Sequence, residues 1–168
     1  PLSGPSCPAV SGVTKQLVIL LHGLGADGND LFGLTDELAQ ALPNAAFASP
    51  DAPFPCDMAP WGYQWFSLRE WSEASMLRGA EEAAPLLNAY IDQQKNQHGL
   101  EDSQVALLGF SQGTMMAFQV ALRRPAPLAG IVGFSGAMVA PHLLEQQIIA
   151  KPPICLIHGM ADPVVPFA

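Results

Sequence analysis

Residues 109–113 of this 168-residue chain read Gly-Phe-Ser-Gln-Gly and fit the pattern G-x-S-x-G. That spacing suits a nucleophilic serine on a sharp turn from strand to helix, because the flanking glycines carry no Cβ atoms to clash. The apolar residues 105–108 predict a strand before the serine, and residues 114–123 predict a helix after it. Such a helix directs partial positive charge at the reaction centre. We therefore predict Ser111 as a nucleophile, the alternative being a structural serine in a tight turn.

Residues 133–136 read Gly-Phe-Ser-Gly and form a near match to the same pattern. The second glycine comes one position too early, and Pro141 follows soon after. We interpret Ser135 as an ordinary turn at the end of a strand.

A serine nucleophile needs backbone donors for the oxyanion that forms during acyl transfer. One donor is normally the N–H of the following residue, which is Gln112, and the other comes from the loop after an earlier strand. The loop at residues 22–28, His-Gly-Leu-Gly-Ala-Asp-Gly, follows an apolar run at 16–21 and offers the Leu24 N–H. Its three glycines also fit the dinucleotide-binding pattern G-x-G-x-x-G, but no acidic residue at a strand end roughly twenty residues on completes it.

An acidic residue follows the last apolar run of the chain. Asp162 comes just after residues 158–161, downstream of the serine, in the chain order serine, acid, histidine. Its role would be to orient a histidine and stabilise its charge, and the alternative is a simple turn with Pro163. No histidine follows before the chain ends at Ala168.

The chain has four histidines, and none occupies the third place in that order. We expect each to be structural or solvated: His22, His98, His142 and His158. We therefore expect the catalytic base to come from a segment after Ala168, and the 168 residues alone to be almost inactive.

Short apolar runs alternate along the chain with longer segments of helical character. The expected strands are residues 16–21, 45–49, 104–110, 128–134 and 154–157. The expected helices are 31–42, 73–97 (which Pro85 should kink or divide), 112–123 and 142–150. This alternation predicts an α/β domain with a mostly parallel sheet, whose ligand site lies at the carboxyl ends of the strands. We expect one domain over residues 1–168, with residues 1–14 as a loose N-terminal arm.

Six of the 13 aromatic residues lie between Phe54 and Trp71, among several prolines. A long, stiff, aromatic-rich segment after a strand can form the wall or lid of a pocket. It can also pack a small core of its own, and the sequence leaves both interpretations open.

Composition excludes several classes of function. The net charge of −8 argues against nucleic-acid binding and against attraction to anionic lipid. The longest apolar run is too short to cross a membrane, and we see no signal peptide, so we expect no stable membrane insertion and a cytoplasmic location. Three scattered cysteines without a C-x-x-C pair argue against a disulfide framework or a zinc site. We expect no metal and no organic cofactor.

Four segments together resemble the small α/β-hydrolases of the phospholipase/carboxylesterase group, which includes bacterial carboxylesterases and acyl-protein thioesterases. They are residues 22–28, 65–68, 109–113 and 158–166, and the resemblance runs from about residue 15 to 167. It implies a three-layer α/β-hydrolase fold whose last strand and helix are missing from this chain.

The same resemblance implies a role for each matching residue. Ser111 would be the nucleophile and Asp162 the acid, with Leu24 and Gln112 as oxyanion donors. The residues beside the acyl pocket would be Trp65, Phe66 and Leu68.

The function we expect is cleavage of carboxylic esters or thioesters with short to medium acyl chains through an acyl-enzyme. The substrate would be a small-molecule ester or an acylated molecule, and a homodimer is left open. Two alternatives remain: a non-catalytic binding protein on a hydrolase scaffold, and a hydrolase of amide bonds.

Overall fold

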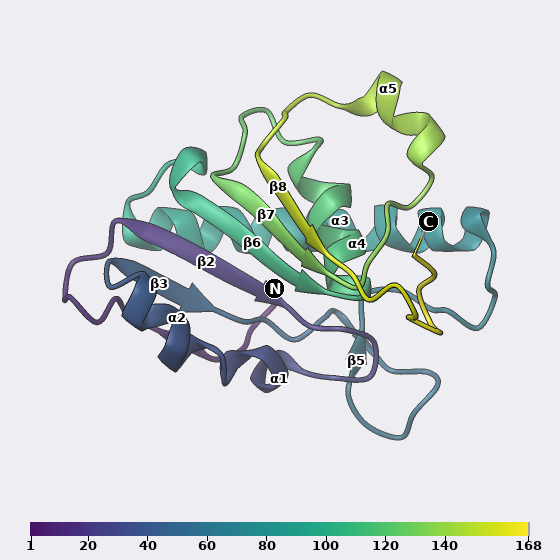
Figure 1. Cartoon of the computed structure of the whole chain (residues 1–168), viewed down its shortest axis with the longest axis horizontal. Coiled ribbons are helices and arrows are strands. Elements are labelled where there is room, and N and C mark those ends of the chain that lie inside the picture. Colours follow the sequence, from purple (N-terminus) through teal and green to yellow (C-terminus); the bar gives the residue numbers. More distant parts are fainter. Residues whose placement is uncertain (168) are drawn as a thin grey trace.

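The computed structural model describes residues 1–167 and is built on a six-stranded sheet in the order β1-β3-β2-β6-β7-β8 (Figure 1). Only β1 runs antiparallel to its neighbour. The strands are β1 (Ser6–Cys7), β2 (Gln16–Leu21), β3 (Ala45–Ala48), β6 (Val105–Phe110), β7 (Gly130–Phe134) and β8 (Ile154–Ile157), with a separate antiparallel pair of β4 (Phe54–Pro55) and β5 (Tyr63–Gln64). The expected α/β fold with a mostly parallel sheet is confirmed.

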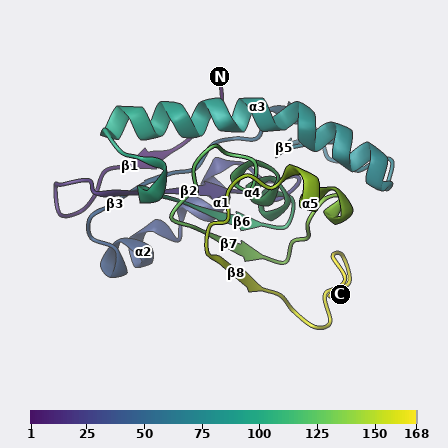
Figure 2. The ribbon, with the colours of Figure 1, turned by 90° about the horizontal axis from the view of Figure 1, so that it is seen from above.

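Helices cover the two faces of this sheet (Figure 2). They are α1 (Gly28–Phe32), α2 (Thr35–Ala41), α3 (Glu73–His98), α4 (Gln112–Ala121) and α5 (Leu144–Gln147). Successive side chains of a strand point to opposite faces. On β2, Leu17, Ile19 and Leu21 pack in the core shared with α3 and α4. Val18 and Leu20 pack in a second core on the side of α1 and α2. The result is three layers.

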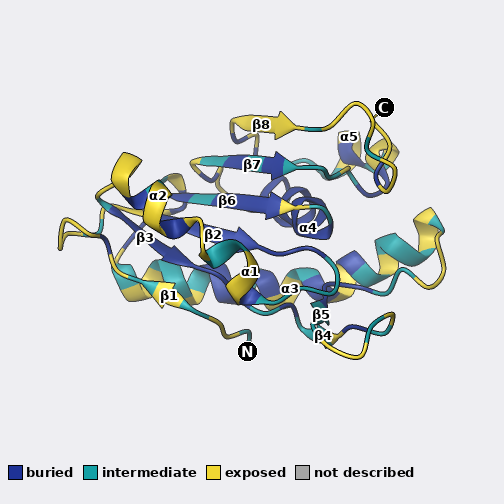
Figure 3. Ribbon diagram, turned by 60° about the horizontal axis from the view of Figure 1, so that its bottom comes forward, coloured by how far each residue is buried: buried dark blue, intermediate teal, exposed yellow. Residues whose placement is uncertain are grey.

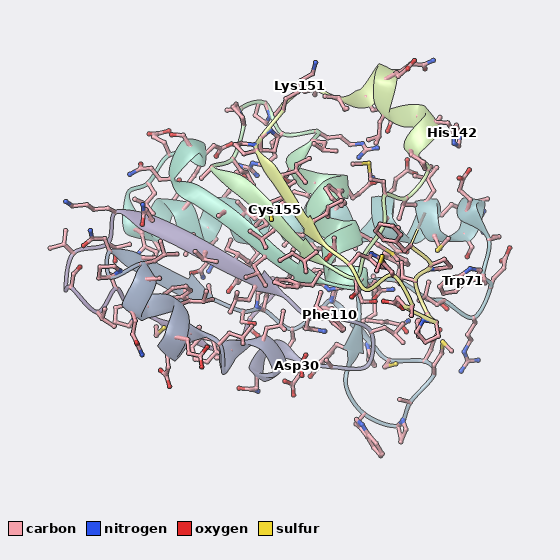
Figure 4. All side chains as sticks on the ribbon, in the orientation of Figure 1. Asp30, Trp71, Phe110, His142, Lys151 and Cys155 are labelled. Atoms are coloured by element: carbon pink, nitrogen blue, oxygen red, sulfur yellow. The ribbon has the colours of Figure 1, made fainter. Side chains whose placement is uncertain are left out.

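The sheet is poorly covered at β8. This strand pairs with β7 on one side only, and all four of its residues are exposed (Figure 3). Ile154, Leu156 and Ile157 keep 43%, 54% and 49% of their surface exposed. Figure 4 shows the Cys155 side chain on the same strand. Among residues 1–167, β8 is therefore an edge strand with apolar surface open to solvent.

The N-terminal arm is more ordered than the sequence suggests. Residues 6 and 7 form β1 and pair with β3. The carbonyl oxygens of Ser3 and Pro5 also accept hydrogen bonds from the backbone N–H groups of Asp51 and Ser49, both at 2.9 Å. Unpaired backbone groups at a sheet edge attract such an extended segment whatever its side chains are.

Two helical segments differ from expectation. The expected helix at residues 31–42 is divided into α1 and α2 at Gly33, and α1 begins earlier because Asp27 caps it by accepting from the Asn29 N–H. In α3, Pro85 does not divide the helix, which continues for 26 residues to a left-handed Gly99. Figure 2 shows α3 as one gently bent ribbon across the sheet.

Candidate active site

Ser111 lies on the turn between β6 and α4 in a strained backbone conformation. Its φ and ψ are 51° and −115°, a region that residues other than glycine rarely adopt. Such a conformation costs roughly 1–3 kcal/mol and persists only where the surroundings enforce it. Here the Ser111 N–H donates to the Phe134 carbonyl of the neighbouring strand at 2.8 Å. This is the sharp strand-to-helix turn that the sequence predicts for the serine.

The two glycines of the motif are required by close packing. A Cβ atom on Gly109 would lie 2.5 Å from the Thr114 backbone nitrogen. A Cβ atom on Gly113 would lie 2.5 Å from the Leu21 carbonyl carbon and 2.8 Å from the His22 carbonyl oxygen. All three distances are shorter than real contacts allow. The start of α4 is thus packed directly against the end of β2.

The loop after β2 lies at the same sheet end as the serine, because Leu21 is in register with Gly109. The loop is anchored to β5: the Gly25 N–H donates to the Tyr63 carbonyl, and the Tyr63 N–H donates to the Ala26 carbonyl, both at 2.8 Å. In the part of the chain that the structure describes, neither the Leu24 N–H nor the Gln112 N–H has a hydrogen-bond acceptor. Both expected oxyanion donors are therefore available to a bound group.

Asp162 is held by its own loop just after β8. Its Oδ1 accepts from the backbone N–H groups of Val164 and Val165, each at 2.9 Å. These two hydrogen bonds, that from Val165 first, lower the pKa of the carboxyl below its usual value. Smaller contributions in the same direction come from His158 and Ser135. The second oxygen, Oδ2, lies 3.7 Å from the His158 Nε2. Asp162 is thus a carboxylate with one oxygen fixed and the other directed at an imidazole.

None of the four histidines forms a hydrogen bond or ion pair with Ser111 within residues 1–167. The His158 Nε2 lies 2.7 Å from the Val165 carbonyl oxygen. His142 lies 3.5 Å from Glu73 and is placed away from Phe110, the neighbour of Ser111 (Figure 4). His98 ends α3, and His22, the first residue of the loop after β2, is fully buried.

The aromatic segment is divided between the core and the surface. Trp65 and Phe66 are buried in the main core, whereas Trp61 and Trp71 are exposed, and Figure 4 shows Trp71 at the periphery. Leu68 is partly buried against the same core. The segment borders a groove of about 400 Å³ lined by Phe54, Gln64, Phe66, Ser67, Ser75, Arg78, Gly79 and Glu82. The segment thus both packs inward and forms one wall of a groove with α3.

Two polar side chains have connections that the sequence motifs did not indicate. The Gln112 side chain is fully buried: its Oε1 accepts from the Trp65 N–H and its Nε2 donates to the Phe66 carbonyl, both at 2.8 Å. The second is His22, whose ring bonds to backbone on both sides. The bonds from Gln112 to residues 65 and 66 and the bond from Ala52 to His22 join residues 30 to 47 positions apart, so no local spacing predicts them.

Ser135 shares one property with Ser111. Its φ is 50°, and its N–H donates to the Ile157 carbonyl at 2.9 Å. No helix follows it directly, since the next helical turn begins at Pro141. The positive φ therefore marks a strand-end turn here, without a helix N-terminus behind the hydroxyl.

Residues 1–167 contain no group of three or more His, Cys, Asp or Glu side chains that could hold a metal ion. They also include no helix long and apolar enough to span a bilayer. The three cysteines are free thiols.

The fold and the serine turn are those of an α/β-hydrolase, and the comparisons identify which kind. Residues 7–168 match the Phospholipase/Carboxylesterase family, and the chain belongs to it. The chain is 33% identical over 164 residues to acyl-protein thioesterase 1 of Saccharomyces cerevisiae, covering 90% of this chain and 72% of the yeast protein. It is 27% identical to esterase YpfH of Escherichia coli, covering 92% of this chain and 65% of that protein.

Among solved structures, the crystal structure of esterase PE8 is similar with a TM-score of 0.94 and 48% identity. The match covers 98% of this chain and 78% of PE8. The chain thus spans between about two thirds and four fifths of the length of these three relatives.

Proposed function

We propose that this chain carries the nucleophile, acid and oxyanion donors of a serine hydrolase that cleaves carboxylic esters or thioesters. The observation that carries the proposal is the turn at Ser111, with a φ of 51° at the N-terminus of α4 and packing that admits only glycine at 109 and 113. Strain of this kind clusters at functional sites. The relatives named as esterases and a thioesterase support the same class of reaction.

In the proposed reaction, the Ser111 Oγ attacks the acyl carbon, and its proton passes to a general base. The C–O or C–S bond of the substrate breaks as the alcohol or thiol leaves with that proton, and an acyl-enzyme remains. Water then attacks the acyl-enzyme and releases the acid. The negative oxygen of each tetrahedral intermediate would lie between the Leu24 and Gln112 N–H groups. Asp162, held ionised by its loop, would orient and stabilise the imidazole of the base.

Among residues 1–167, no histidine is hydrogen-bonded to Ser111, so the general base of the proposed reaction is not in place. We propose that the 168 residues alone turn substrates over slowly, at the residual rate that an oxyanion hole and binding provide. A non-catalytic binding protein is the second candidate, and the lack of a histidine bonded to Ser111 within residues 1–167 favours it. Covalent labelling by a fluorophosphonate that depends on Ser111 separates the two, because a binding protein has no nucleophile to label.

The proposed substrate is a small-molecule ester or an acylated molecule with a short to medium chain. The partly buried Leu68 would contact the acyl group, with Trp65 and Phe66 supporting it from the core. Because burial of each methylene gains only about 0.8 kcal/mol, preference should rise gradually with chain length and then stop. A panel of aryl esters, thioesters and anilides of increasing acyl length tests this, and faster anilide turnover would favour an amide hydrolase.

The panel should be repeated with Leu68→Ala, because Leu68 is partly buried and tolerates truncation better than Trp65. The expected result is a shift of the preferred acyl length, and an unchanged profile would remove this segment from the pocket. A cytoplasmic location is also part of the proposal, and fractionation of cells that produce the tagged protein tests it.

A further inference from the structure

His22 is a buried titratable residue that the proposed reaction does not use. It follows β2 directly, and none of its surface is exposed. Its Nε2 lies 2.9 Å from the Ala52 backbone nitrogen, and its Nδ1 lies 2.7 Å from the Gly23 carbonyl oxygen. A backbone N–H can only donate, so Nε2 must be the unprotonated acceptor. The proton of the neutral ring is therefore on Nδ1, which donates to the Gly23 carbonyl.

The Gly23 carbonyl and the Leu24 N–H belong to one peptide unit. A trans peptide is planar, and its C=O and N–H point in opposite directions. A hydrogen bond that fixes the carbonyl of Gly23 therefore fixes the direction of the Leu24 N–H as well. From this geometry we propose that His22, as its Nδ1–H tautomer, is a positioning residue that aims the Leu24 N–H into the oxyanion hole. The inference rests on the proposed function and assigns His22 a role within the same site.

The preceding peptide unit, which joins His22 to Gly23, is also fixed by a hydrogen bond. The Trp65 indole Nε1–H donates to the His22 carbonyl oxygen at 3.0 Å, and the two rings lie 6.0 Å apart between centroids. Trp65 is itself fixed by its backbone N–H, which donates to the Gln112 side chain. Two consecutive peptide units of the loop thus have their carbonyls bonded to buried side chains, which leaves the Leu24 N–H little freedom to turn.

The role requires a neutral ring. A proton on Nε2 would face the Ala52 N–H and break that hydrogen bond. Burial lowers the pKa of His22, although the Gly23 carbonyl and the carboxylates of Asp51, Asp27 and Asp30 act in the opposite direction. A residue that merely fills space would need no particular tautomer, so the tautomer separates a positioning role from a packing role.

Two substitutions each keep one of the two ring hydrogen bonds of His22 and remove the other. His22→Asn places an amide nitrogen near the position of Nδ1, so it can donate to the Gly23 carbonyl but cannot reach Ala52. His22→Gln places an amide oxygen near the position of Nε2, so it can accept from Ala52 but has no donor for Gly23. Both variants lose ring packing, and circular dichroism and thermal unfolding establish that each is folded.

Turnover of an aryl ester by the chain and by both variants gives the first readout. His22→Gln should lose roughly 10²–10³-fold in kcat with little change in KM, as for removal of one oxyanion donor. His22→Asn should keep kcat within about tenfold of the parent chain, since its donor remains. Even a slow parent rate is informative, because residual catalysis without a base comes from the oxyanion hole and binding. Equal losses in both variants, or an unchanged kcat in His22→Gln, would overturn the proposal.

Two further measurements do not depend on activity. In ¹⁵N-detected NMR of the parent chain, His22 should be protonated on Nδ1 and not on Nε2. Crystal structures should show the Gly23–Leu24 peptide turned in His22→Gln and unchanged in His22→Asn. The opposite tautomer, or an unmoved peptide in His22→Gln, would overturn the inference even in an active enzyme. Absence of fluorophosphonate labelling at Ser111 beside the expected tautomer and peptide would instead count against the proposed function.

Discussion

The side chain of Gln112 joins the turn of the candidate nucleophile to the backbone at Trp65, 47 positions earlier in the chain. Its amide accepts from the Trp65 N–H and donates to the Phe66 carbonyl, both at 2.8 Å, in a site without solvent exposure. The residue that offers its own N–H for the oxyanion thus also holds the aromatic segment in place. The backbone and the side chain of Gln112 serve two different parts of the site.

Gln112→Ala should therefore destabilise the protein more than it impairs acyl transfer. The change leaves a buried N–H and a buried carbonyl without partners, and each such group costs roughly 1–3 kcal/mol. We expect the free energy of unfolding in urea to fall by about 2 kcal/mol or more. The loss in kcat should stay well below the roughly 10²-fold effect of losing an oxyanion donor, because the backbone N–H remains.

Gln119→Ala is the matched control, because Gln119 is a buried glutamine of the same helix with no side-chain hydrogen bond among the described residues. Its effect on unfolding should be under about 1 kcal/mol. Equal destabilisation by the two changes would show that the amide of Gln112 contributes no more than helix packing.

Much of the fold follows from the sequence because the strands of a parallel sheet are typically continuous apolar runs. The runs at 16–21 and 154–157 coincide with β2 and β8, and that at 104–110 begins one residue before β6. The boundary between α1 and α2 was missed, since the capping hydrogen bond of Asp27 and the turn at Gly33 compete with a helical pattern that continues across them. The N-terminal arm was wrongly expected to be loose, because pairing at a sheet edge depends on backbone groups and not on side-chain pattern.

The sequence predicted some residues of the candidate site and their surroundings better than others. The turn at Ser111 follows from local steric rules, so the pattern G-x-S-x-G was enough to predict it. The tautomer of His22 depends on the hydrogen bond from Ala52, and the role of Gln112 depends on bonds to Trp65 and Phe66. Only the folded chain brings these residues near. No spacing rule reports such contacts, although an unexplained histidine and glutamine inside glycine-rich turns are a signal worth testing.

Burial of His22 predicts a pH dependence of stability. Its pKa in the folded protein is lowered from the ordinary value of 6.5, mainly by desolvation. The unfolded chain therefore binds a proton first as pH falls below 6.5, which favours unfolding. The stabilisation is complete above that pH and is lost toward the lower pKa of the folded state, by up to about 1.4 kcal/mol per pH unit.

Urea unfolding of the parent chain and of His22→Gln between pH 7.5 and 5 measures this pH dependence. Each unit of difference between the unfolded and folded pKa corresponds to about 1.4 kcal/mol of stability. The difference between the two curves should shrink as pH falls, since the variant has no ring to protonate. A difference that stays constant with pH would mean that His22 is not held neutral by the fold.

Asp102 and Arg124 form a buried ion pair that ties the start of β6 to the end of α4. The guanidinium donates to both Asp102 oxygens, at 3.1 and 2.9 Å, and the two side chains keep 8% and 4% of their surface exposed. Removing one partner of a buried pair costs roughly 3–5 kcal/mol, and loss of Asp102 leaves Arg124 and Lys95 with only the half-exposed Asp92 as a charged partner. Asp102→Asn should lower the free energy of unfolding by about 3 kcal/mol.

Asp92 offers a control at the same guanidinium. It lies 2.6 Å from the Arg124 Nη2 but is 50% exposed, so Asp92→Asn should cost under about 1 kcal/mol. Similar losses in the two variants would refute the distinction between the buried and the exposed partner.

Covalent labelling of Ser111 tests the central claim most directly. The 168-residue chain, incubated with an excess of a fluorophosphonate, should form an adduct that peptide mass spectrometry places on Ser111. Ser111→Ala should abolish the adduct, because the variant has no hydroxyl at that position to form the bond to phosphorus. Ser135→Ala, which alters the other serine with a positive φ, should leave the adduct in place. An adduct that persists in Ser111→Ala, or that forms on Ser135 in place of Ser111, would contradict the account.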